Sequence, residues 1–143
     1  MQLDVILKGA QICANVAAAI AALWALRVYR SNSRRERARW AETLYARFFE
    51  KSDLKDIREI VDSNADDPKV EELVSNETAA WTDYLNFFEF VAYLQESKQL
   101  SKEDVGALLG YYLECLKRHR SCRDYIQDKG KGFEHLRALL FQK

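Results

Sequence analysis

The chain is 143 residues long, and its 22 acidic side chains balance its 22 basic ones. This length allows one small hydrophobic core and excludes several independently folded domains. The three cysteines, Cys13, Cys115 and Cys122, exclude an even disulfide framework, so no structural disulfide is expected.

The amino-terminal stretch Gly9–Leu26 contains no charged residue and no proline. A helix rises about 1.5 Å per residue and the hydrocarbon core of a bilayer is about 30 Å thick, so about 20 mostly apolar residues cross it. The sequence from Val5 to Val28 meets that length, with Lys8 near the outer edge. We therefore predict one membrane-spanning helix within residues 1–30, with membrane lipid as its partner.

The polar residues of this predicted helix recur at spacings of four and three, which places them on one side. Small alanines continue the same spacing. Polar groups are costly in lipid unless they find partners, and small residues let helices approach closely. The pattern predicts a homo-oligomer through a seam that lines or closes a pore, made by Asp4, Lys8, Gln11, Asn15, Ala18, Ala22 and Ala25. A passive anchor that carries these residues by chance is the alternative.

Net charge is distributed unevenly along the chain. Residues 1–39 hold seven Lys/Arg and two Asp/Glu, a net +5, and residues 40–143 hold fifteen and twenty, a net −5. Basic flanks stay on the cytoplasmic side, so we predict an inner-membrane protein with its amino terminus outside and its carboxyl terminus in the cytoplasm. A cleaved signal peptide is disfavoured, since its positive charge would precede the apolar run.

The basic excess forms an Arg-rich juxtamembrane segment, residues 31–39, together with two arginines just before it. Arginines at this place usually set topology and contact anionic lipid, and nucleic-acid binding is the less common alternative. The residues concerned are Arg27, Arg30, Arg34, Arg35, Arg37 and Arg39.

Residues 40–143 are predicted to form a cytoplasmic helical bundle, because helical periodicity dominates and no alternating strand pattern is evident. Ser31–Ser33 is either a short break or part of a helix that continues to Glu50. Ser52 can cap the next helix. Ser63–Lys69 holds the only proline and is predicted to be a loop, followed by a short helical turn at Val70–Val74.

The strongest predicted core helix is Ala79–Glu96. Ser101 then opens another helix with a capping box in which Asp104 replaces the usual Glu. A last short helix follows the sequence Lys129–Gly132. The predicted fold is therefore all-α, with four main helices in an up-and-down bundle.

The sequence offers little enzymatic chemistry. Cys115, His119 and Cys122 would share one helix face, but structural zinc sites need four ligands and catalytic ones three with water. No phosphate-binding loop or nucleophile elbow occurs, and no Arg precedes His119 or His135 at the spacing of HEPN-type ribonucleases. We predict no enzyme, no catalytic residue, no metal and no cofactor.

A second basic cluster, distinct from the arginines near the membrane, lies toward the carboxyl terminus. Such a cluster is usually a solvated face. Repeated around a ring of subunits, however, it would concentrate positive charge and bind an anionic ligand such as a nucleotide or oligonucleotide. Its residues are Lys117, Arg118, Arg120, Arg123, Lys129 and Lys131.

Two short motifs carry a family resemblance. They are the NFFE segment Asn86–Glu89 and the later segment Gly132–Leu136, in which an aromatic residue precedes Glu and Leu. With them the chain resembles the bacterial domain of unknown function 4760 family, small proteins that often have one amino-terminal span and an Arg-rich helix after it. No catalytic residues are assigned to that family, so the resemblance implies none here.

The general plan is also similar to small membrane effectors of antiphage systems, such as the Hailong effector and the pore protein of some RNA-targeting CRISPR systems. That similarity implies membrane depolarisation as the output. We therefore expect an oligomeric channel or pore effector in antiphage defence, gated through its cytoplasmic helical domain. The alternative is a membrane-tethered adaptor that docks a cytoplasmic partner protein.

Overall fold

The structure, a computed structural model, describes residues 2–50, 52–65 and 67–142, with the side chains of residues 2–14, 30, 31, 33, 34 and 53 excepted. The predicted all-α fold is confirmed, since every regular element in these residues is a helix. The elements are α1 Gln2–Phe49, α2 Ser52–Val61, α3 Pro68–Ser75, α4 Ala79–Glu96, α5 Lys102–Arg118, α6 Arg120–Gln127, the 3₁₀ helix η1 Lys129–Lys131, and α7 Glu134–Phe141.

The chain divides into two compact units, Met1–Arg39 (unit 1) and Trp40–Lys143 (unit 2). Helix α1 contributes to both, and its backbone continues without a break through Ser31–Ser33. Within the described part of the chain, no helix has both the length and the apolar character needed to cross a membrane.

Two of the predicted helix starts are confirmed. At α5, Ser101 Oγ accepts from the Asp104 N–H at 3.1 Å and Asp104 Oδ2 accepts from the Ser101 N–H at 3.0 Å, which is the predicted capping box. Helix α4 begins at Ala79 as predicted, and Thr78 Oγ1 accepts from the Trp81 N–H at 3.2 Å. Each cap satisfies backbone donors that have no partner within the helix.

The prediction of a loop over Ser63–Lys69 is wrong at its carboxyl end. Helix α3 begins at Pro68, and Asp67 caps it by accepting from the Lys69 N–H at 2.8 Å. Proline favours the first position of a helix because it has no N–H to leave unpaired there and its φ is already helical. The proline therefore opens the helix.

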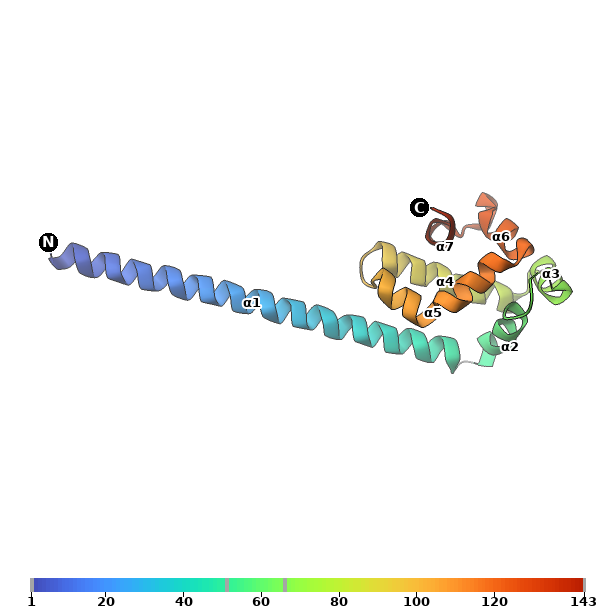
Figure 1. Cartoon of the computed structure of the whole chain (residues 1–143), viewed down its shortest axis with the longest axis horizontal. Helices are drawn as coiled ribbons and strands as arrows, with labels where there is room; N and C mark the ends of the chain where they lie inside the picture. The colour runs from blue at the N-terminus through green and yellow to red at the C-terminus, as the bar shows by residue number, and fades with distance from the viewer. Residues whose placement is uncertain (1, 51, 66, 143) are drawn as a thin grey trace. The chain divides into compact units, whose positions relative to one another are not determined.

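Unit 2 is built around the antiparallel pair α4 and α5, which lie side by side and are joined by the turn before Ser101 (Figure 1). Helix α7 packs mainly on α4, α2 contacts both α4 and α5, and α3 packs on α6. Helices α2 and α3 lie at the end of the pair opposite that turn (Figure 1). The short helices thus complete a core that α4 and α5 alone would leave open.

The centre of this core is Phe48, in the last turn of α1, which is fully buried. Its ring stacks on Phe87 of α4, with centroids 5.0 Å apart, and meets Tyr112 of α5 edge-on at 4.9 Å. The Arg58 guanidinium of α2 lies 5.2 Å from the Phe48 ring centroid and donates to the Phe48 carbonyl. Four elements therefore meet at one side chain.

We expect Phe48→Ala to lower the free energy of unfolding of unit 2 by about 3–5 kcal/mol, because it removes a buried ring and leaves a cavity. Urea unfolding followed by the fluorescence of buried Trp81 measures this. Tyr45→Ala is the control on the same helix: Tyr45 is 51% exposed, and its loss should cost about 1 kcal/mol. Equal effects of the two substitutions would contradict the central role of Phe48.

Candidate functional site

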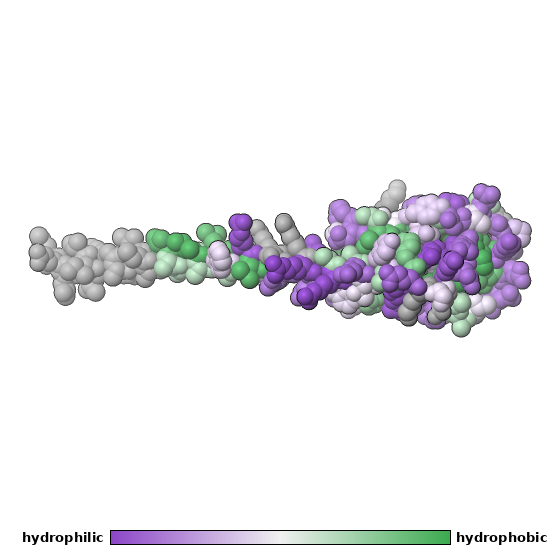
Figure 2. Space-filling model, turned by 90° about the horizontal axis from the view of Figure 1, so that it is seen from below, coloured by the Kyte–Doolittle hydropathy of each residue, from purple (hydrophilic) through white to green (hydrophobic). Residues whose placement is uncertain are grey.

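The described apolar side chains of unit 1 are uncovered within the chain. Trp24 is 70% exposed, Leu23 69% and Ile20 62%, and all other side chains described between Asn15 and Tyr29 are exposed as well. Figure 2 shows them as a hydrophobic stretch that adjoins the hydrophilic arginine-rich stretch. Covering one large aliphatic side chain contributes about 1.5–3 kcal/mol, so these exposed side chains lack that stabilisation within the described structure.

The predicted seam is partly within the described residues. Asn15, Ala18, Ala22 and Ala25 are all exposed on α1. The side chains of Asp4, Lys8 and Gln11 lie outside the described residues. The described members follow the four-and-three spacing of one continuous helix, which keeps them on one side of it.

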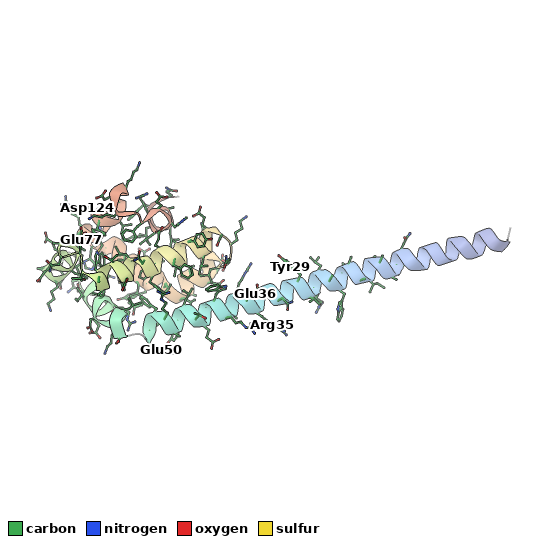
Figure 3. The ribbon with its side chains drawn as sticks, turned by 180° about the vertical axis from the view of Figure 1, so that it is seen from behind. Tyr29, Arg35, Glu36, Glu50, Glu77 and Asp124 are labelled. Carbon is green, nitrogen blue, oxygen red and sulfur yellow. The ribbon has the colours of Figure 1, made fainter. Side chains whose placement is uncertain are left out.

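Arg27, Arg35, Arg37 and Arg39 of the Arg-rich stretch are exposed, whereas the side chains of Arg30 and Arg34 lie outside the described residues. Arg35 and Glu36 project from α1 among these side chains (Figure 3). Unit 1 therefore presents exposed apolar side chains followed directly by exposed guanidinium groups.

In the carboxyl-terminal basic cluster, two arginines contact the ends of helices. Arg118 Nη1 donates to the Ser63 carbonyl just beyond α2 at 3.1 Å. Arg123 Nη1 donates to the carbonyls of Lys117 at 2.6 Å and Arg118 at 3.0 Å, at the end of α5. Carbonyls at a helix carboxyl end lack intrahelical partners and carry partial negative charge, so cations are favoured there.

Three other cations of the cluster have acidic neighbours. Lys117 Nζ lies 2.6 Å from Glu114, and Arg120 Nε lies 3.5 Å from Asp124. Lys131 pairs with Glu77, and its Nζ lies 4.8 Å from the centroid of the Tyr125 ring. Lys129 is exposed. An anionic ligand would have to share these cations with carboxylates already beside them.

Arg120 also lines a cleft of about 420 Å³ between the start of α3 and α6, together with Asp67, Glu71, Ser121 and Asp124. Figure 3 shows Asp124 on α6 and Glu77 in the turn between α3 and α4. Three carboxylates face one guanidinium in the cleft, so its field disfavours an anion. The sequence gives no local signal for this cleft, because its lining comes from Asp67–Glu71 and Arg120–Asp124, which are far apart in the chain.

The prediction that Cys115, His119 and Cys122 share one helix face is wrong. His119 has ψ 124° and separates α5 from α6, so the helical spacing stops there. Its buried ring is held by Nε2, which lies 3.0 Å from the Val61 carbonyl. Among the described residues, no group of three or more His, Cys, Asp or Glu side chains is placed to hold a metal ion.

Glu89, the last residue of the NFFE segment, caps another helix. Its two carboxylate oxygens accept from the N–H groups of His135 at 3.0 Å and Leu136 at 2.7 Å, in the first turn of α7. Helix α7 has no side-chain cap of its own. A carboxylate at a helix amino terminus satisfies unpaired donors and complements the helix dipole.

Further contacts hold the same turn of α7 to the same face of α4. His135 Nδ1 lies 2.5 Å from Glu96 Oε2, and the His135 ring meets Tyr93 edge-on at 5.5 Å. Glu89, Tyr93 and Glu96 follow helical spacing. Leu136 is fully buried. The two sequence motifs are therefore the two sides of one contact, between α4 and α7.

The model of the domain of unknown function DUF4760 matches residues 12–129. The chain belongs to this family. The match includes the NFFE segment and ends before α7, so Gly132–Leu136 lies outside it. No curated protein and no solved structure matches the chain.

In this DUF4760 protein, Glu89→Gln should destabilise the docking of α7 by about 1–2 kcal/mol, because a neutral amide replaces a charge-assisted double acceptor. Hydrogen exchange should then accelerate at the amides of His135 and Leu136. Asn86→Ala, at an exposed position one turn earlier on α4, is the control and should leave exchange in α7 unchanged. Unaltered exchange in Glu89→Gln would contradict the capping role.

Burial raises the pKa of the Cys122 thiol to about 12 and also raises the pKa of Cys115. Since the thiolate is the reacting species, a raised pKa leaves little of it at pH 8, and Cys122 should react about 10³-fold more slowly than a free thiol. We expect Cys13→Ser protein to react slowly with Ellman's reagent when native and to release both thiols rapidly in urea. A rapid reaction of the native protein with Ellman's reagent would show that Cys115 and Cys122 are accessible to solvent.

Proposed function

We propose that this DUF4760 protein is an oligomeric membrane effector whose copies assemble through the amino-terminal part of α1 and open a path for ions, in antiphage defence. The observation that carries the proposal is the sorting of side chains along this helix. Asn15 and the seam alanines follow one side, and the large exposed side chains of Ile20, Leu23 and Trp24 lie largely away from it. A helix that serves only as an anchor has no need of such sorting.

The membrane part of the proposal rests on the whole run Gly9–Leu26. This run contains no charge, and its first six residues lie outside the described side chains. The arginines that follow favour an amino terminus outside the inner membrane and unit 2 in the cytoplasm. They would also contact anionic headgroups, a partner that matches their exposure.

The pore would be lined by the polar members of the seam. Lys8 and Asn15 would set ion preference, because polar and charged rings determine which ions enter a narrow path. Unit 2 would gather the subunits and transmit a trigger. An anionic ligand such as a nucleotide is one candidate trigger, and exposed Lys129 is the residue of the basic cluster at which to test it first. The similarity of plan to antiphage channel effectors supports this output.

The seam is tested by replacing its polar side chains. We expect the double variant Asn15→Leu with Lys8→Leu to reduce ion efflux from protein-containing liposomes to the level of protein-free liposomes. It should also remove toxicity in cells, because an apolar lining excludes ions. Ile20→Leu, on the other side of the helix, is the matched control and should preserve both. Undiminished flux in the double variant would show that the seam lines no pore.

The second candidate is a membrane-tethered adaptor that docks a cytoplasmic protein. The observation that favours it is that unit 2 has a hydrophobic core of its own, which contains Phe48 and aromatic side chains of α4. Exchange of Gly9–Leu26 for an unrelated apolar helix separates the two functions. An adaptor would keep its activity after the exchange, whereas a pore effector would lose ion flux.

A further inference from the structure

Two glycines on α5, Gly106 and Gly110, have no explanation within the chain. They lie one turn apart in the interior of the helix, where glycine is destabilising relative to alanine. Apart from the backbone of its own helix, a Cβ added at either position would meet no described atom within 4 Å, so no described neighbour excludes alanine. Isolated glycines within a helix usually have a packing reason, and the described residues supply none for these two.

The glycines line a groove of about 300 Å³ between α5 and α7. Leu113 is nearly buried within it and Leu139 and Leu140 are half-buried, so its walls are largely apolar. Its charged members lie toward the ends of α5. The residues around it are Gln95, Lys102, Val105, Gly106, Gly110, Leu113, Glu114, Lys117, Leu139 and Leu140.

We propose that this groove receives helix α5 of a second copy of the chain, packed antiparallel about a two-fold axis at Gly110. Glycines one turn apart let two helix backbones approach closely. A two-fold contact uses the same patch on both copies, so each groove would be filled by the helix that lines the other. The contact belongs to unit 2 and is separate from the seam proposed for α1.

Charge complementarity selects the antiparallel arrangement. Glu103 lies in the first turn of α5 and Lys117 in the last, and their separation of fourteen residues places them on nearly the same side of the helix. Position 110 is midway between them, so packing Gly110 against Gly110 brings Glu103 of each copy beside Lys117 of the other. A parallel pair would instead align like charges and helix dipoles.

The test is site-directed cross-linking of the full chain in lipid nanodiscs, in a Cys13→Ser background. Cys115 and Cys122 are buried and free, so an introduced cysteine is the reactive one. Gly110→Cys should form a disulfide between copies at least tenfold faster than Asn86→Cys, an exposed control position on α4. Equal rates at the two positions would overturn the proposal.

Charge exchange then tests the register. Glu103→Lys and Lys117→Glu should each slow the cross-link at position 110 several-fold, and the two together should restore it. Exchange of the exposed pair Lys55 and Glu59 on α2 is the matched control and should have no effect. Failure of the double variant to recover would exclude the pairing of Glu103 with Lys117.

Gly106→Ala with Gly110→Ala separates folding from association. We expect this variant to unfold at a higher urea concentration than the parent and to associate at least tenfold more weakly through unit 2. A variant that is more stable and equally associated would contradict the groove contact. This contact and the proposed function can be tested separately. Asn15→Leu is expected to disrupt the α1 seam and to leave the cross-link formed by the Gly110→Cys protein unaffected.

Discussion

The burial of Phe48 among aromatic side chains of α4 and α5 is the contact on which unit 2 depends. Aromatic rings bury large areas and favour the edge-on and offset geometries found here. Arg58 covers the same ring and donates to the carbonyl at the end of α1, so the end of the helix and the core are fixed together. The last turn of α1 is therefore a structural part of the bundle.

Several helix ends in unit 2 are satisfied by side chains from distant parts of the chain. Helices of eight to ten residues have nearly as many unpaired backbone groups as paired ones, and each group left buried without a partner is costly. Glu89 supplies the acceptors for α7, while Arg118 and His119 contact the carbonyls at the end of α2. Part of the basic cluster thus stabilises the fold, and fewer of its cations are left to bind an anionic ligand.

The two units differ in how many of their apolar side chains are exposed. Unit 1 has a net charge of +5, and its apolar side chains that the structure describes are exposed. Unit 2 buries most of its described apolar residues and leaves an unexplained pair of glycines on α5. The two proposed contacts between copies rest on these features, one on small residues of α1 and the other on the groove beside α5.

Local patterns in the sequence determined the helix Ala79–Glu96, the capping box at Ser101 and the all-α fold, because caps and periodicity depend on residues three or four apart. The tertiary structure alone decided the break at His119 and the role of Glu89. The partners that fix them, Val61 and the amides of α7, lie 58 and about 46 residues away in the chain. Helical spacing predicts which residues share a face of a helix. Only the packing of the helices determines which distant backbone group a buried side chain contacts.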